Sequence, residues 1–228
     1  MNNSLKQEKY IEMVSERKAC RLCEDSGLTN PSVVDGGKHD ANEIGPWTRW
    51  NGDLNAQILV VGQEWGSIAS FVAQRGLDKA DSDTNEMLVY LLASVGIDIS
   101  DAPKGRPDSG VFLTNAALCL KEGNAQSTVK KQWFKNCSTA FLRRQIDLVQ
   151  PRVVVALGKE AYQAICYAYD MDSVSKFSDA IGLIVPIKNT DGIRMIPVSH
   201  CSAIALNINR PRSKQFHDWM LVKAALHA

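Results

Sequence analysis

Three short apolar runs constrain the fold of this chain more than any other feature. They span 58–61 (ILVV), 111–114 (VFLT) and 153–157 (VVVAL). Runs of this kind, without polar alternation, are typical of strands buried on both faces of a sheet. Segments with helical spacing separate them, which predicts a parallel sheet with helices on both sides.

The remaining elements follow from periodicity and from the residues that end each element. Helices are expected at about 5–19, 85–95, 131–149, 159–169 and 211–226. Segments 181–187 and 193–198 flank NTDG (189–192), a hairpin-like signal. Residues 24–55, rich in Gly, Pro, Asn and Asp, are expected to be irregular, and long ordered loops are usually functional.

Length and composition indicate an ordinary globular protein. The chain has 228 residues, of which 45% are hydrophobic and 22% charged, so we expect a single domain over 1–228 with segment 1–55 packed on it. No apolar run approaches the roughly 18 residues of a membrane span, and the N-terminus lacks the apolar core of a secretory signal. We therefore expect a cytoplasmic protein, with no membrane partner, whose six cysteines are reduced thiols or metal ligands.

Charge is unevenly distributed along the chain. The net charge is +1, but residues 1–110 carry 11 Lys and Arg against 17 Asp and Glu, whereas residues 111–228 carry 15 against 8. This asymmetry is a weak indication of a polyanionic partner, and chance partition of surface charge explains it about as well.

Four cysteines are spaced as metal ligands. Cys20 and Cys23 form a C-x2-C pair, while Cys119 follows a buried strand and Cys137 lies on a predicted helix. Four thiolates fit either a structural zinc or a [4Fe–4S] cluster. Cys166, inside a predicted helix, is expected to be a packed core thiol.

Polar residues and glycines follow the predicted strands where each one ends. They are Gly62, Gln63, Glu64, Trp65 and Gly66, then Asn115, Gly158, and Ser199, His200, Cys201 and Ser202. In open parallel sheets, ligands bind beyond the carboxyl ends of the strands. These residues are therefore expected to surround one site.

The ordered set of motifs resembles the uracil-DNA glycosylase superfamily, and most closely its iron–sulfur (type-4) branch. The matching stretches are CRLC (20–23), ILVVGQEWG (58–66), VFLTNAALC (111–119), NCSTAFLRRQIDLVQPRVVVALG (136–158) and IPVSHCSAIAL (196–206). The resemblance implies a three-layer α/β/α sandwich with a central four-stranded parallel sheet. It also implies a monomer and a [4Fe–4S] cluster on the four cysteines, with zinc as the alternative.

The resemblance further implies base-excision repair by a monofunctional enzyme that hydrolyses the N-glycosidic bond of uracil in DNA. Asn115 is expected to read the edge of the flipped base, His200 to stabilise the leaving base, and Glu64 to hold water or offset charge on the sugar. Gly62, Gln63, Trp65, Gly66, Phe71 and Ser202 are the expected base-binding residues. DNA contacts are expected from Ile204, Leu206, Arg210, Arg212 and Lys214.

Several motif positions depart from the family pattern and leave alternatives open. Trp65 stands where a proline is usual, His200 is followed by Cys201 instead of proline, and the residue that stacks on the base is unassigned between Trp65 and Phe71. Gly66 occupies the position of a tyrosine that excludes thymine in other branches. The alternatives are a glycosylase of the same fold for hypoxanthine or xanthine, and a catalytically silent, metal-stabilised nucleic-acid-binding module.

Overall fold

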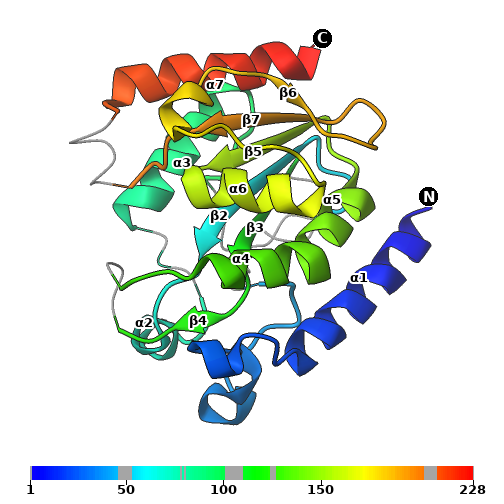
Figure 1. Cartoon of the computed structure of the whole chain (residues 1–228), viewed down its shortest axis with the longest axis vertical. Helices are drawn as coiled ribbons and strands as arrows, with labels where there is room; N and C mark the ends of the chain where they lie inside the picture. The colour runs from blue at the N-terminus through cyan, green and yellow to red at the C-terminus, as the bar shows by residue number, and fades with distance from the viewer. Residues whose placement is uncertain are drawn as a thin grey trace.

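The computed structural model describes residues 2–45, 53–77, 79, 81–100, 110–123, 127–202 and 210–227. A five-stranded sheet with the order β3-β2-β5-β7-β6 forms its centre (Figure 1). The strands are β2 (Ile58–Glu64), β3 (Val111–Ala117), β5 (Val153–Leu157), β6 (Val185–Pro186) and β7 (Arg194–Val198). The four predicted parallel strands are confirmed. The short β6 adds an antiparallel fifth strand at one edge, through the predicted hairpin.

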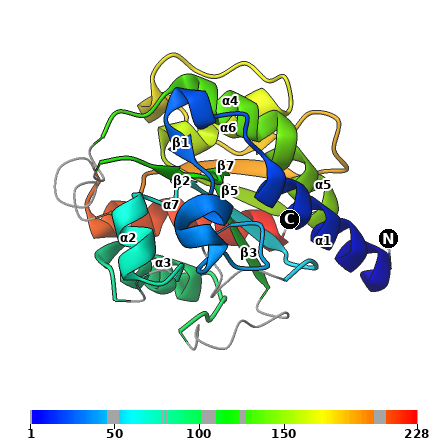
Figure 2. The same ribbon diagram turned by 90° about the horizontal axis from the view of Figure 1, so that it is seen from below.

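Helices cover both faces of this sheet, as the α/β pattern predicts. They are α3 (Asp83–Ser94) and α7 (Arg212–His227) on one face, and α4 (Lys131–Cys137), α5 (Arg143–Val149) and α6 (Lys159–Ala168) on the other. Figure 2 shows the strands between these two layers. The three-layer α/β/α architecture is therefore confirmed.

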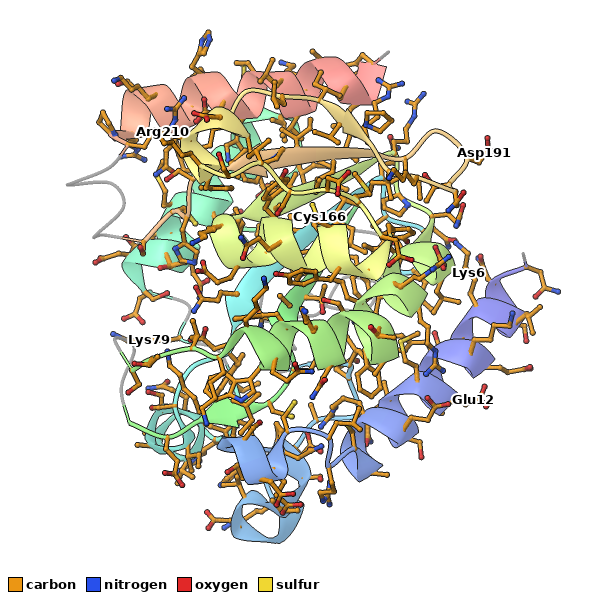
Figure 3. The ribbon with its side chains drawn as sticks, viewed as in Figure 1. Lys6, Glu12, Lys79, Cys166, Asp191 and Arg210 are labelled. Atoms are coloured by element: carbon orange, nitrogen blue, oxygen red, sulfur yellow. The ribbon has the colours of Figure 1, made fainter. Side chains whose placement is uncertain are left out.

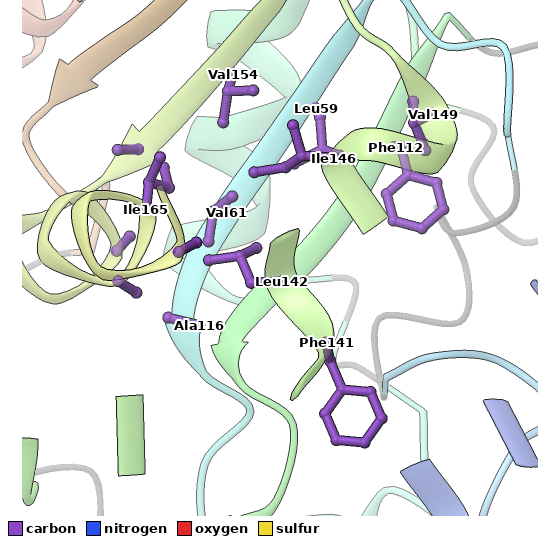
Figure 4. Packing of buried hydrophobic residues seen from close by; sticks show 14 of the residues in the cluster. Leu59, Val61, Phe112, Ala116, Phe141, Leu142, Ile146, Val149, Val154 and Ile165 are labelled. Atoms are coloured by element: carbon purple, nitrogen blue, oxygen red, sulfur yellow. The ribbon is translucent and has the colours of Figure 1, made fainter. Parts of the chain in front are cut away.

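The larger of the two cores lies between the sheet and the helices α4, α5 and α6. Alternate residues of the buried strands, such as Leu59, Val61 and Phe112, point into it and meet Ile146 of α5 and Ile165 of α6 (Figure 4). Their neighbours along the strands point to the opposite face, against α3 and α7. Burial on both faces explains why these strands lack polar alternation.

The predicted helix over 131–149 contains a π-helical turn. Residues Ser138–Leu142 separate α4 from α5 without breaking the helical path, and Ser138, Phe141 and Leu142 are buried. Such turns contain one residue more than an α-helical turn and are frequent at functional sites. Here the turn begins directly after Cys137.

The N-terminal segment packs against this body. Helix α1 (Asn3–Ala19) begins at Asn2, whose side chain accepts the N–H of Leu5 at 2.8 Å. Lys6 joins this helix to the rest of the domain, because its ammonium donates hydrogen bonds to the carbonyl oxygens of Leu54 at 2.8 Å and Val149 at 3.2 Å. Among the described residues, no helix has the length and apolar character needed to cross a membrane.

Residues 24–45 and the segments after β2 and β3 contain short elements that sequence periodicity does not predict. They are the 3-10 turns Glu24–Ser26 and Pro31–Gly37, the strands β1 (Leu28–Thr29) and β4 (Leu120–Lys121), and the helix α2 (Ile68–Ala73). Strands β1 and β4 pair antiparallel, with Leu28 opposite Lys121. This pairing joins the segment after the C-x2-C motif to the segment that follows β3.

Candidate active site

The carboxyl ends of the parallel strands meet at one edge of the sheet. Gly62 of β2 lies opposite Asn115 of β3, and Leu157 of β5 lies opposite Val198 of β7. An open groove of about 440 Å³ at this edge is lined in part by Gln63, Gly158 and His200. The expected strand-end residues therefore share one region of the molecule.

Asn115 places a buried amide at this edge. Its side chain is 2% exposed, and its Oδ1 atom has no hydrogen-bond partner among the described residues. A buried acceptor without a partner costs free energy in the absence of a ligand. Among the described residues, this acceptor beside Gly62 therefore remains without a donor.

His200 is held with one ring nitrogen occupied. Its Nδ1 atom accepts a hydrogen bond from the backbone N–H of Ser202 at 3.1 Å, so in the neutral ring the proton lies on Nε2. Burial lowers the pKa of His200, and the Glu64 carboxylate opposes this shift only in part. Gly158, at φ +92°, packs against the ring, since a Cβ there would lie 3.5 Å from the His200 Cβ. The histidine is thus a neutral hydrogen-bond donor near Glu64.

Glu64 is held by two donors. Its Oε1 atom lies 3.0 Å from the Nζ atom of Lys121, and its Oε2 atom accepts a hydrogen bond from the side-chain amide of Gln63. Sequence reasoning missed Lys121. A single lysine two residues after a cysteine carries no pattern that separates a buried ion pair from an exposed charge.

Trp65 and Phe71, the two candidates for stacking on the base, contact each other. Their ring centroids are 5.0 Å apart in an edge-to-face arrangement. Phe71 is 1% exposed and packs with Val34 and Leu120, whereas Trp65 is only partly buried. Trp65 is therefore the better placed of the two to meet a base. Gly66 has φ +119°, and a Cβ at this position would meet no atom of the described residues within 4 Å.

Helix α7 anchors the loop that carries His200. The Nε2 atom of Gln215 donates to the carbonyl oxygens of His200 at 3.2 Å and Arg210 at 3.1 Å, joining the two ends of segment 200–210. Arg210 also pairs with the buried carboxylate of Asp218, so its charge is largely neutralised (Figure 3).

The other predicted DNA contacts lie near the start of α7 or outside the described part of the chain. The guanidinium of Arg212 lies 4.0 Å from the ring centroid of the exposed Tyr90, and Lys214 is exposed. Ile204 and Leu206 lie outside the described residues. The roles of all these residues in DNA binding stay predictions.

The four predicted ligand cysteines line a single pocket between α1, the segment after β3, and α4. Leu118 N–H donates to the Sγ atom of Cys137 at 3.4 Å, and the Asn136 amide donates to that of Cys23 at 3.3 Å. Burial raises the pKa of the Cys119 thiol to about 12. No three His, Cys, Asp or Glu side chains within the described ranges could together hold a single metal ion.

The other two cysteines lie apart from this pocket. Cys166 is buried on α6, as expected of a core thiol (Figure 3). Cys201 is buried in the histidine loop, and its thiol donates to the Thr84 carbonyl oxygen at 3.5 Å.

Comparisons with known proteins agree with this arrangement. The family model of the Uracil DNA glycosylase superfamily matches residues 50–221. The chain is 23% identical to a type-4 uracil-DNA glycosylase of Archaeoglobus fulgidus, over 92% of this chain and 89% of that protein. It is 27% identical to a type-5 uracil-DNA glycosylase of Pyrobaculum aerophilum, over 73% of this chain and 69% of that protein. The family match spans most of the chain and includes the strand ends that form the candidate site, so the protein belongs to the uracil-DNA glycosylase superfamily.

Proposed function

We propose that this protein removes uracil from DNA by hydrolysing its N-glycosidic bond, without cutting the strand. The observation that carries the proposal is the buried, unpartnered Oδ1 atom of Asn115, described above. The N3–H group of uracil is a donor that this oxygen could accept, and the amide NH2 could donate to the neighbouring carbonyl oxygen of the base. A base flipped out of the helix would then be recognised by its edge.

In the proposed reaction, water replaces the base at C1′ of the sugar. The electron pair of the glycosidic bond leaves with the base, which becomes negatively charged, while the sugar becomes cationic. His200 supplies a neutral Nε2–H donor to the leaving base, and Glu64 offsets the charge on the sugar or holds the attacking water. Glu64 lies close enough to His200 to oppose the lowering of its pKa, which is consistent with both groups lining one site.

We also propose that Cys20, Cys23, Cys119 and Cys137 hold a [4Fe–4S] cluster. Their shared pocket supports this, and so does Arg17, which lines it and has a buried Nε donor with no partner among the described residues. A zinc ion would need its thiolates about 2.3 Å from one point. The described side chains are not gathered so closely. Bound there, the cluster would stabilise the fold by joining α1, the segment after β3, and α4.

A second candidate function is removal of a larger deaminated base, such as hypoxanthine or xanthine. The open space at Gly66 favours it, because no atom in the described part of the chain lies within 4 Å of where a Cβ would stand. In this reading the same Asn115 and His200 would meet the edge of a purine.

Incubation with a uracil-containing oligonucleotide, followed by hot alkali, tests the proposal. Strand cleavage after alkali, with none before it, is the expected result for a monofunctional glycosylase. Cleavage at hypoxanthine or xanthine but not at uracil would support the second function. Binding without release of any damaged base would indicate a silent binding module.

A further inference from the structure

Lys121 is a buried cation that touches the candidate catalytic carboxylate. Its side chain is 1% exposed, whereas that of Glu64 is 11% exposed. The Nζ atom lies 3.0 Å from Glu64 Oε1 and 3.4 Å from the carbonyl oxygen of Ser127. The lysine is thus enclosed, while the carboxylate it holds keeps some surface for a substrate.

The two oxygens of Glu64 are held from two different elements. Lys121, on β4, contacts Oε1, and Gln63, on β2 itself, contacts Oε2. A carboxylate with a donor on each oxygen is hindered from rotating about its last bond. If Gln63 alone remained, the carboxylate could turn and present either oxygen.

The backbone around Lys121 fixes where its ammonium lies. The N–H of Lys121 donates to the carbonyl oxygen of Gly66 at 3.1 Å, two residues beyond Glu64. On its other side, β4 pairs with β1, with Leu28 opposite Lys121. The position of the ammonium relative to Glu64 is therefore set by main-chain bonds, and not only by the flexible side chain.

A buried ion pair is weak evidence for stability, because desolvation of both charges offsets much of their attraction. The better-supported use of such a pair is to fix a particular arrangement of groups. Here the arrangement fixed is that of the Glu64 carboxylate, which follows Gln63 of the groove and lies close enough to His200 to oppose the lowering of its pKa.

We propose that Lys121 is a positioning residue, which holds Glu64 in the orientation that base removal requires. The inference rests on the proposed function, since it gives Glu64 a role in the reaction. Lys121 itself touches no substrate in this account. Its whole effect on the rate passes through Glu64.

A double-mutant cycle tests this dependence. The variants are Glu64→Gln, Lys121→Met and the double variant, each purified as the full chain under the same conditions as the wild type. The substrate is a duplex oligonucleotide with one uracil, and the readout is the single-turnover rate at saturating enzyme. Lys121→Met is expected to lower this rate roughly 10- to 100-fold, as a misplaced catalytic group does. The half-saturating enzyme concentration should change little.

The decisive comparison is made in the Glu64→Gln background. There, adding Lys121→Met should change the rate by less than about 3-fold, because the group it positions is already lost. A further loss of 10-fold or more would overturn the proposal, as would a Lys121→Met variant with the full wild-type rate. Lys121→Gln is a second single variant, in case Lys121→Met does not fold. If both fail to fold, Glu64→Gln and the double variant still make this comparison, since neither leaves an unpaired carboxylate.

Lys6→Met is the matched control. Lys6 is also a buried lysine, and its ammonium donates to Leu54, Asn55 and Val149. It lies on a different side of the molecule from Arg210, which lines the groove (Figure 3). This variant should lose thermal stability and keep the wild-type single-turnover rate. If the wild-type protein itself releases no uracil, the proposed function fails. If the wild type releases uracil and Glu64→Gln is slower, but the cycle does not give these results, only the role of Lys121 fails.

Discussion

The backbone N–H of Ser202 donates to the Nδ1 atom of His200 at 3.1 Å. Because that nitrogen must act as an acceptor, a second proton on the ring would break this bond and displace the imidazole. Burial lowers the pKa of His200, so protonation is delayed to lower pH than for an exposed histidine. The arrangement therefore ties the activity of the site to pH in a definite direction.

The rate of uracil release is expected to stay level from pH 8 down to about 6.5, the ordinary pKa of histidine, and to fall only at lower pH. The sign follows from the lowered pKa in the folded protein, which keeps the ring neutral throughout that range. Single-turnover rates between pH 5 and 8 measure it. In His200→Gln, the part of the decline in rate at low pH that is due to the histidine should vanish. A wild-type rate that has already fallen fully by pH 7 would contradict the expectation.

Asn115→Ala should separate recognition from stability. The rate should fall roughly 100-fold, since the variant loses both contacts to the edge of the base. The free energy of unfolding should change by no more than about 1 kcal/mol, because the Oδ1 atom that is removed has no partner among the described residues. Urea unfolding and uracil release are the two measurements. Asn42→Ala is the control, because Asn42 is exposed and its side chain accepts a hydrogen bond from Lys18.

Gln215→Leu should lower both the stability of the protein and the rate of uracil release, although Gln215 is not itself a predicted site residue. Gln215 joins the backbone at His200 to that at Arg210, so its loss frees both ends of the histidine loop. We expect a loss of about 1 to 3 kcal/mol in the free energy of unfolding and a lower rate of uracil release. Gln132→Ala, which removes an exposed bond to Asn136 on α4, should change neither. Unaltered kinetics in Gln215→Leu would show that the loop is held by other contacts.

The salt dependence of DNA binding should distinguish the basic residues near the start of α7. Arg212→Ala and Lys214→Ala should each reduce the slope of log K against log salt by about 0.9 if the side chain contacts a phosphate. Arg210→Ala should change it less, because Asp218 already pairs with that guanidinium. Lys223→Ala, exposed near the other end of α7, serves as the control and should leave the slope unchanged.

Cys20→Ser and Cys137→Ser should each abolish the broad absorption at about 400 nm expected of an iron–sulfur protein. They should also lower the melting temperature by about 10 °C, since the proposed cluster would join separate segments of the fold. Cys166→Ala, which changes a buried thiol outside the shared pocket, should keep the absorption. A colourless wild-type protein that contains one zinc per chain would contradict the cluster.

The parallel strands could be predicted because their burial on both faces leaves a visible mark in the sequence. Asn115 and His200 could be singled out because they lie near the carboxyl ends of two of those strands, Asn115 within β3 and His200 two residues after β7. Their roles stay predictions. The two-residue strands β1 and β4 leave no such mark, because their pairing depends on backbone contacts between distant segments. The pairs of Lys121 with Glu64 and of Arg210 with Asp218 were missed for a related reason. A single charged side chain gives no sequence signal of the distant partner that it meets once the chain has folded.

The π-helical turn Ser138–Leu142 makes the number of residues in this segment matter to the pocket that the four cysteines line. One residue corresponds to about 100° of rotation around a helix. A chain shortened by one residue here could regain a regular α-helix. With α5 still packed on the sheet, α4 would then be rotated by about 100° around the helix axis. Cys137 would then face away from the other three thiols, although every ligand would still be present in the sequence.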